Sequence, residues 1–173
     1  MKVMFAARLV DFKDPITFIR ASLILPHHDF VVAGDGELLD DCRKIAGRNV
    51  TFLGWVPQFV VNENMINADV FCQLSPIENI WSSSLILAMK YKKAIVCTNV
   101  GHTTRFLENG VHALLIPAKN EIVLANALVK LENDDLRHTL GMNAFHYYRN
   151  ALEITGIIKQ IRALIQEASI ASS

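Results

Sequence analysis

Short, uninterrupted apolar runs alternate with longer segments of helical periodicity, and this alternation limits the fold more than any other feature of the sequence. The apolar runs cover residues 3–9, 30–33, 50–53, 70–74, 94–98 and 113–116. A strand that is apolar at almost every position is typical of a parallel sheet with helices on both faces. We therefore expect an α/β fold, a Rossmann-like doubly wound parallel sheet of about six strands.

The segments between these runs have the spacing of amphipathic helices. They cover 15–25, 37–46, 59–68, 82–92 and 103–109. After Pro117 the apolar runs stop, and the patterns at 121–132, 136–152 and 157–168 predict a helical C-terminal tail. Because no repeat or long linker interrupts the pattern, we expect residues 1–173 to form a single domain.

The charge balance, the lengths of the apolar runs and the cysteines argue against a nucleic-acid-binding, transmembrane or disulfide-bonded protein. The chain has 17 Lys and Arg against 17 Asp and Glu, whereas a nucleic-acid binder needs a net basic face. No apolar run approaches the roughly 18 residues of a transmembrane segment. The three cysteines lie in apolar segments without CxxC spacing, which indicates buried thiols in a reducing compartment. We expect a cytoplasmic protein.

Candidate ligand-binding residues follow the strands, because open parallel sheets bind ligands beyond the carboxyl ends of their strands. Arg8 and Lys13 follow the first apolar run and precede a helix that Asp14 and Pro15 predict as its N-cap and first residue. Two cations beside a helix N-terminus suit a diphosphate. Alternatively, the two side chains lie on a surface loop where they are solvated and bind no ligand.

The loop after the third run contains Gly54, Trp55 and Val56. It offers backbone groups and an aromatic edge to a nucleobase, although a loop tryptophan is as often a packing residue. The turn at 34–36 lacks the third glycine of a GxGxxG motif, and we interpret it as a tight turn that needs glycine conformations.

The loop after the fourth run is the richest in polar groups. Glu78 and Asn79 come first, followed by three serines, Ser82, Ser83 and Ser84, at the expected start of a helix. These serines can cap the helix, and its first N–H groups can receive an anion. A capped helix with a solvated glutamate fits this segment equally well.

No residue pattern predicts a metal site or a cofactor. The acidic pairs at 40–41 and 134–135 lie in helical or linking segments. His138 and His146 are eight residues apart on an expected helix, too far for one metal ion, and His27-His28 is expected in a turn before a strand.

Taken together, these segments resemble the donor-binding half of the group-1 retaining glycosyltransferases, the GT-B enzymes with two Rossmann-like domains. The resemblance lies in a series of short segments that keep the order and approximate spacing of the family. They are Ala7-Arg8-Leu9 with Lys13, Val32-Ala33-Gly34-Asp35-Gly36, Val50-Thr51-Phe52-Leu53-Gly54-Trp55-Val56, Ala68-Asp69-Val70-Phe71, Leu74-Ser75-Pro76-Ile77-Glu78, Ala88-Met89 with Ala94-Ile95-Val96, Asn99-Val100-Gly101, and Glu108-Asn109-Gly110 with Leu114-Leu115-Ile116-Pro117.

The resemblance implies a UDP- or GDP-linked sugar as the substrate and transfer of its sugar with retention. Arg8 and Lys13 would hold the diphosphate, and the Gly54–Val56 loop would face the base. Glu78 would match the first acid of the Glu-x7-Glu motif, as the catalytic residue near the donor sugar. Asn79 and the serines 82–84 would complete the substrate site, with no metal and no cofactor. The resemblance also implies a role in polysaccharide biosynthesis and a peripheral membrane location of the intact enzyme.

The sequence also departs from the family pattern. Leu87 stands where the second acid of the motif is expected, so the ribose hydroxyls lose a charged acceptor, worth roughly 1.5–3 kcal/mol. The usual glycine-rich turn is replaced by residues 79–82, and His102 and Arg105 stand where a glycine and a glutamate are usual.

The first strand begins almost at Met1, so we expect the N-terminal acceptor domain of the GT-B architecture to be absent. Half a cleft cannot orient two substrates, and orientation supplies about 7–11 kcal/mol of barrier reduction. We therefore expect the chain alone to be inactive as a hexosyltransferase. Two alternatives stay open: a degenerate, non-catalytic nucleotide-binding or interaction domain, and a fragment of a GT-B-like nucleotide-sugar epimerase.

Overall fold

The computed structural model of the chain describes residues 1–77, 82–101, 103–158 and 161–162. These residues form a six-stranded parallel sheet in the order β3-β2-β1-β4-β5-β6, which is the Rossmann strand order. The strands are β1 (Lys2–Ala6), β2 (Asp29–Ala33), β3 (Val50–Gly54), β4 (Val70–Gln73), β5 (Ala94–Thr98) and β6 (Leu114–Ile116). The predicted Rossmann-like α/β fold is confirmed.

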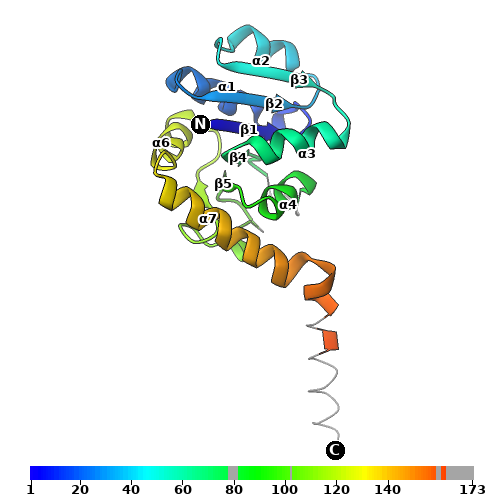
Figure 1. Cartoon of the computed structure of the whole chain (residues 1–173). Coiled ribbons are helices and arrows are strands. Elements are labelled where there is room, and N and C mark those ends of the chain that lie inside the picture. The colour runs from blue at the N-terminus through cyan, green and yellow to red at the C-terminus, as the bar shows by residue number, and fades with distance from the viewer. Residues whose placement is uncertain (78–81, 102, 159–160, 163–173) are drawn as a thin grey trace, which may run out of the picture.

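Helices cover both faces of the sheet (Figure 1). The α-helices are α1 (Pro15–Ile24), α2 (Leu39–Ile45), α3 (Gln58–Asn67), α4 (Ser83–Lys90), α5 (Thr103–Phe106), α6 (Glu121–Lys130) and α7 (Asp134–Tyr147). A 3-10 turn, η1 (Asp11–Lys13), precedes α1, and a π-helical turn, η2 (Tyr148–Leu152), follows α7.

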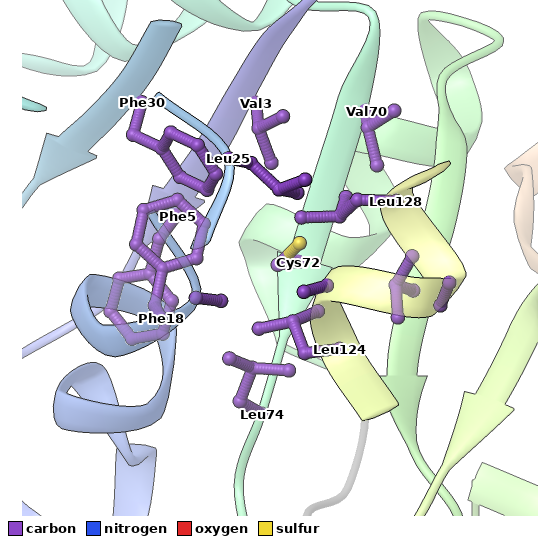
Figure 2. Packing of buried hydrophobic residues seen from close by; sticks show 14 of the residues in the cluster. Val3, Phe5, Phe18, Leu25, Phe30, Val70, Cys72, Leu74, Leu124 and Leu128 are labelled. Carbon is purple, nitrogen blue, oxygen red and sulfur yellow. The ribbon is translucent and has the colours of Figure 1, made fainter. Parts of the chain in front are cut away.

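The core has two layers because alternate side chains of a strand point to opposite faces. In β1, Val3 and Phe5 join α1, α2 and α6 in one layer, which Figure 2 shows from close by. Met4 and Ala6 face α3 and α4 in the other layer. Every residue of β4 and β5 is buried, as the continuous apolar runs predicted. The three cysteines are buried and unpaired.

Polar side chains fix the starts of several helices. Asp14 accepts a hydrogen bond from the Thr17 amide and Pro15 is the first residue of α1, so the predicted helix start is confirmed. Asn120 and Asn133 cap α6 and α7 in the same way.

The boundaries of two expected elements differ from the prediction. The helix expected over 103–109 ends at Phe106, because Asn109 pairs with Ala113 and accepts a hydrogen bond from the Leu115 amide, which turns the chain into β6. The strand expected over 3–9 ends at Ala6. The Ala7 amide instead donates to the carbonyl of Ala33 at the end of β2 and the Leu9 amide to that of Asp35 in the following loop, and Ala7 lines the candidate site.

The C-terminal tail is helical where it is described. Residues 154–158 and 161–162 are in helical conformation, and the remainder of the helix expected over 157–168 lies outside the described residues. Among the described helices, none has both the length and the apolarity needed to span a bilayer.

Candidate functional site

The carboxyl edge of the sheet carries two cations that share one aromatic ring. Arg8 follows β1 and Lys13 ends η1; the guanidinium carbon of Arg8 lies 6.0 Å and the Nζ of Lys13 lies 5.3 Å from the centre of the Phe12 ring. Both distances are those of cation–π contacts. Phe12 therefore holds the two charges near each other.

The local electrostatics of this pair favour an anion. Partial burial, and secondarily the Arg8 guanidinium, lower the pKa of the Lys13 ammonium from its ordinary value. Among the residues that the structure describes, neither cation has an ion-pair partner. The two positive charges repel each other, and a bound anion would offset this repulsion. A diphosphate carries enough negative charge to pair with both cations.

A pocket opens beside Arg8, with a volume of about 260 Å³. Four of the residues predicted for the site, Arg8, Trp55, Val56 and Ser84, line this pocket. A smaller hollow, lined by Lys13 and Ser82, shares Ala6 and Ala7 with the pocket. The loops after β1 and β3 and the start of α4 thus meet at one place, although they are far apart in the sequence.

The first turn of α4 is fixed against the end of β4. The Ser82 hydroxyl accepts a hydrogen bond from the Leu85 amide at 3.1 Å, and it donates to the side-chain carbonyl of the buried Gln73. Ser84 lines the pocket, whereas Ser83 is exposed and lines neither hollow. Of the three serines predicted for the site, one caps the helix, one faces the pocket and one faces solvent.

A hydrogen-bond chain links the loop after β4 to the cation-bearing loop. The Ser75 hydroxyl donates to the Phe12 carbonyl, and the Thr98 hydroxyl donates to the Ser75 carbonyl. Ser75 and Thr98 are both buried. These contacts couple the ends of β4 and β5 to the segment between Arg8 and Lys13.

Gly34 allows the loops after β1 and β2 to approach each other, and Gly54 supplies a left-handed backbone conformation at the end of β3. Gly34 donates its N–H to the Gly54 carbonyl at 2.8 Å, and a Cβ atom on Gly34 would lie only 1.9 Å from the Ala7 carbonyl oxygen. Gly54 has a φ of +68° with open space around its Cα. The interpretation of 34–36 as a tight turn omitted this close contact with the first loop.

The structure also places residues at the pocket that the sequence did not single out. Asp35 and Gln58 line it beside Trp55, and Phe12 organises the cations. Asp35 lies in a turn that lacks a dinucleotide motif, and Gln58 is an ordinary polar residue at a helix start. Only their position after β2 and β3 could have indicated them.

Three further positions, Glu78, Asn79 and Leu87, were singled out from the sequence. Glu78 and Asn79, predicted as the catalytic residue and a substrate contact, lie outside the described residues. Leu87, which replaces the expected second acid, packs against the core layer formed by α3 and α4. The roles predicted for the residues of this site stay predictions.

A model of the family described as glycosyl transferases, group 1, matches residues 1–134. The chain belongs to this family. The match covers the whole sheet, all the loops of the candidate site, and α6, so the family assignment includes the region where the two cations and the pocket lie. No curated protein matches the chain significantly.

Solved structures of glycosyltransferases share the fold. HepE from Anabaena, in complex with UDP and glucose, matches with a TM-score of 0.83 and 20% identity, over 96% of this chain and 48% of HepE. A TarM mutant from S. aureus, with UDP among its ligands, matches with a TM-score of 0.80 and 20% identity, over 94% of this chain and 35% of TarM. The C-terminal domain of LpcC from Francisella tularensis matches with a TM-score of 0.77 and 19% identity, over 88% of this chain and 86% of that domain.

This chain therefore spans about half the length of HepE and about a third of the length of TarM. Its length is close to that of the isolated LpcC C-terminal domain. The resemblance to the C-terminal half of GT-B glycosyltransferases, inferred above from short sequence segments, is confirmed by the family and by the fold.

Proposed function

We propose that this chain is the donor-binding domain of a glycosyltransferase and binds a nucleoside-diphosphate sugar at the carboxyl edge of its sheet. The observation that carries the proposal is the pair of cations, Arg8 and Lys13, held on one aromatic ring beside a pocket and the start of α4. In this arrangement the diphosphate binds the two cations and the base lies against Trp55 and Val56. HepE, which shares the fold, has been solved with UDP-glucose.

The same groups would serve the chemistry as well as the binding. Glycosyl transfer breaks the bond between the sugar and the diphosphate, and negative charge builds up on the departing diphosphate. Arg8, Lys13 and the first N–H groups of α4 would stabilise this charge where it develops. We assign the role of the catalytic residue near the donor sugar to Glu78, with Asn79 as a substrate contact.

Transfer of a hexosyl group with retention is part of the proposal. Because HepE and TarM are two and three times as long as this chain, transfer would need a second, acceptor-binding domain. The acceptor domain is expected to supply the other wall of the cleft and to orient the acceptor. The chain alone would then bind the donor without turning it over.

Calorimetric titration of the chain with UDP, GDP, ADP and UDP-glucose tests the donor site directly. We expect micromolar binding of UDP or GDP, weakened about 10- to 150-fold by Arg8→Ala or by Lys13→Ala, since each removes a charge-assisted contact worth about 1.5–3 kcal/mol. Lys44→Ala is the matched control, because Lys44 is an exposed cation paired with Asp41 on α2, away from the pocket. Absence of binding for all four nucleotides, or equal losses in the Lys44 variant, would contradict the proposal.

A second candidate function is a non-catalytic nucleotide-binding domain. The observation that favours it is Leu87, whose partly buried side chain packs against the core and offers no acceptor to the ribose hydroxyls. In that case the chain would bind UDP or GDP weakly, and the longest natural form of the protein would show no sugar transfer, with or without Glu78→Gln. In the donor-site proposal, Glu78→Gln abolishes transfer and leaves nucleoside diphosphate binding within about threefold of the wild type.

A further inference from the structure

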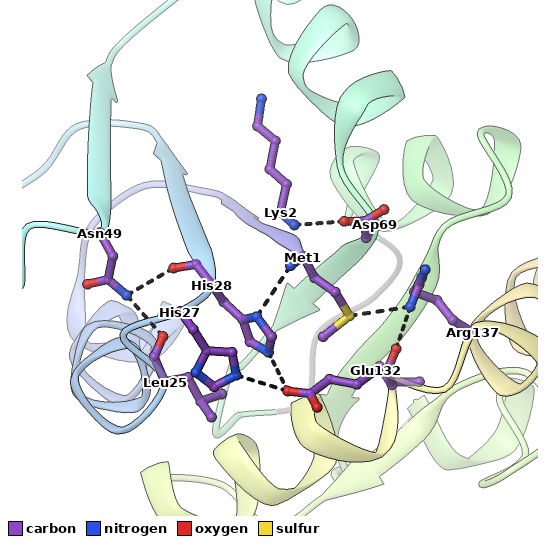
Figure 3. A network of polar contacts seen from close by, with 10 residues as sticks. Met1, Lys2, Leu25, His27, His28, Asn49, Asp69, Glu132 and Arg137 are labelled. Atoms are coloured by element: carbon purple, nitrogen blue, oxygen red, sulfur yellow. Dashed lines mark hydrogen bonds and ion pairs between the residues drawn. The ribbon is translucent and has the colours of Figure 1, made fainter.

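A cluster of two histidines and a glutamate lies at the opposite edge of the sheet from the candidate donor site. His27 and His28 form the turn between α1 and β2, and Glu132 lies in the turn between α6 and α7. Figure 3 shows the two imidazole rings and the carboxylate directed toward one point. The glutamate is more than a hundred residues away in the sequence, so no local motif indicates the cluster.

The three side chains bring their ligand atoms close to one another. The Nε2 of His27 lies 3.0 Å and the Nε2 of His28 lies 2.9 Å from the same Glu132 oxygen, and the ligand atoms all lie within 4.8 Å of one another. Tetrahedral zinc, with bonds of about 2.0–2.2 Å, holds its ligand atoms about 3.3 Å apart. The two nitrogen–oxygen distances are a few tenths of an ångström shorter than this value, and no pair of ligand atoms exceeds it by more than about 1.5 Å (4.8 minus 3.3 Å), so rotation of the side chains would bring the three atoms around one ion.

The buried ring of His28 is a further indication that the cluster binds an ion. The side chain is only 3% exposed, and among the described residues its Nε2 atom has no partner in hydrogen-bond geometry, despite its closeness to Glu132. Buried polar atoms without a hydrogen bond are rare in folded proteins. This nitrogen is directed into the cluster, where a metal ion would satisfy it.

The turn that carries the histidines is held in place from the other side. The Asn49 side-chain amide donates to the carbonyls of Leu25 and His28, at 3.1 Å and 3.0 Å. The Met1 amino nitrogen lies 3.3 Å from the Nδ1 atom of His28, so Nε2 is the ring nitrogen that faces the cluster. Outer contacts of this kind orient metal ligands in advance.

We propose that His27, His28 and Glu132 bind a zinc ion, with the fourth position of the tetrahedron open to water. Two imidazoles and one carboxylate are a donor set that Zn²⁺ accepts in proteins. The ion would join the α1–β2 turn to the α6–α7 turn and would stabilise the layer that these helices form. The site is independent of the donor site at the other edge of the sheet.

Titration of the untagged chain with ZnCl₂, by calorimetry at pH 8 where imidazoles are neutral, tests the site, and Co²⁺ serves as an optical probe of tetrahedral coordination. We expect one ion per chain, a rise of several degrees in the thermal midpoint at a hundredfold excess over Kd, and affinity at least about tenfold lower in His27→Ala and in Glu132→Ala. His27 and Glu132 are exposed, so these variants are expected to fold, whereas a variant of the buried His28 is not required for the test.

His138→Ala is the matched control, because His138 is an exposed histidine on α7 that does not belong to the cluster. Unchanged binding in this variant supports the site. Two outcomes would overturn it: the absence of saturable binding by the wild type at 100 µM ZnCl₂, which is about a hundred times a micromolar Kd, and equal affinity of the wild type and the His27 and Glu132 variants. UDP binding is expected to be the same with and without zinc.

Discussion

Ser75 donates a hydrogen bond to the backbone carbonyl of Phe12, and this contact ties the loop after β4 to the loop that carries the two site cations. Both groups are at least partly buried, so the Phe12 carbonyl would lose a partner that water replaces poorly. Ser75→Ala is expected to lower the free energy of unfolding by about 1–3 kcal/mol. It is also expected to weaken UDP binding severalfold, because Lys13 follows Phe12 directly.

Urea unfolding and calorimetry measure the two effects of Ser75→Ala. Ser83→Ala serves as the control, since Ser83 is an exposed serine at the start of α4, and surface substitutions stay within about 0.5 kcal/mol. If Ser75→Ala bound UDP as tightly as the wild type, the contact would not position the cations.

The contact between Gly34 and the Ala7 carbonyl gives a second prediction. A Cβ atom at residue 34 would lie 1.9 Å from the carbonyl oxygen, and the φ of +147° disfavours any L side chain. Gly34→Ala is expected to destabilise the chain by at least about 3 kcal/mol, from backbone strain and overpacking together. Gly110→Ala separates the two causes, because Gly110 also has a positive φ but has open space around it.

Thermal and urea unfolding of both glycine variants check this prediction. Gly110→Ala is expected to cost about 1–2 kcal/mol, from the left-handed conformation alone. Equal destabilisation by the two substitutions would mean that the close approach of the first two loops contributes nothing beyond backbone conformation.

Trp55 is 79% exposed although it lines the pocket, and this exposure fits a surface on which a nucleobase stacks. Stacking on an aromatic side chain is worth about 1–3 kcal/mol per base, so Trp55→Ala is expected to raise the Kd for UDP about 5- to 150-fold. Trp55→Phe is expected to recover most of the affinity, because phenylalanine keeps an aromatic face.

Phe59→Ala is the matched control for the tryptophan. Phe59 is 70% exposed on α3, close to Trp55 in the sequence, and does not line the pocket. Calorimetry is expected to give the same UDP affinity for this variant as for the wild type. A similar loss in both variants would indicate a general effect on the β3–α3 region.

Local patterns were sufficient to predict the fold. Continuous apolar runs such as 70–74 indicated buried parallel strands, and Asp14 with Pro15 marked the start of α1, because a buried strand and a helix cap each depend on a few neighbouring residues. The end of α5 was predicted wrongly, since it depends on the pairing of Asn109 with Ala113 rather than on helical spacing.

The site was predicted only where chemistry and position coincide. Arg8 and Trp55 carry a charge and an aromatic ring at strand ends, so they could be proposed from the sequence. Ser75 and Gly34 act through contacts with residues brought close by the sheet order, and no spacing within the sequence reveals such contacts. The same holds for Glu132 beside His27 and His28.

The last prediction concerns Asp14, which is 6% exposed and caps α1 with a left-handed backbone. Burial raises the pKa of its carboxyl above the ordinary value of 3.8 and outweighs the opposing contacts with Thr17 and Lys119. The folded chain therefore holds this proton to higher pH than the unfolded chain. Because the folded state binds more protons between the two pKa values, the contribution of Asp14 to the free energy of unfolding falls as pH rises through that interval.

Asp14→Asn is accordingly expected to be at least as stable as the wild type at pH 7, because asparagine keeps the acceptor for the Thr17 amide, tolerates the left-handed conformation and carries no charge. Its advantage is expected to vanish below a pH of 3.8, where the wild-type carboxyl is protonated in both states. Asp14→Ala loses the cap as well as the charge, so its cost is expected to be about 1–2 kcal/mol at the acidic end of the range and to shrink as pH rises. Urea unfolding between pH 3.5 and 7.5 measures all three chains, with exposed Asp11→Asn as the control. A stability difference between Asp14→Asn and the wild type that does not change with pH would show that the buried charge is not its cause.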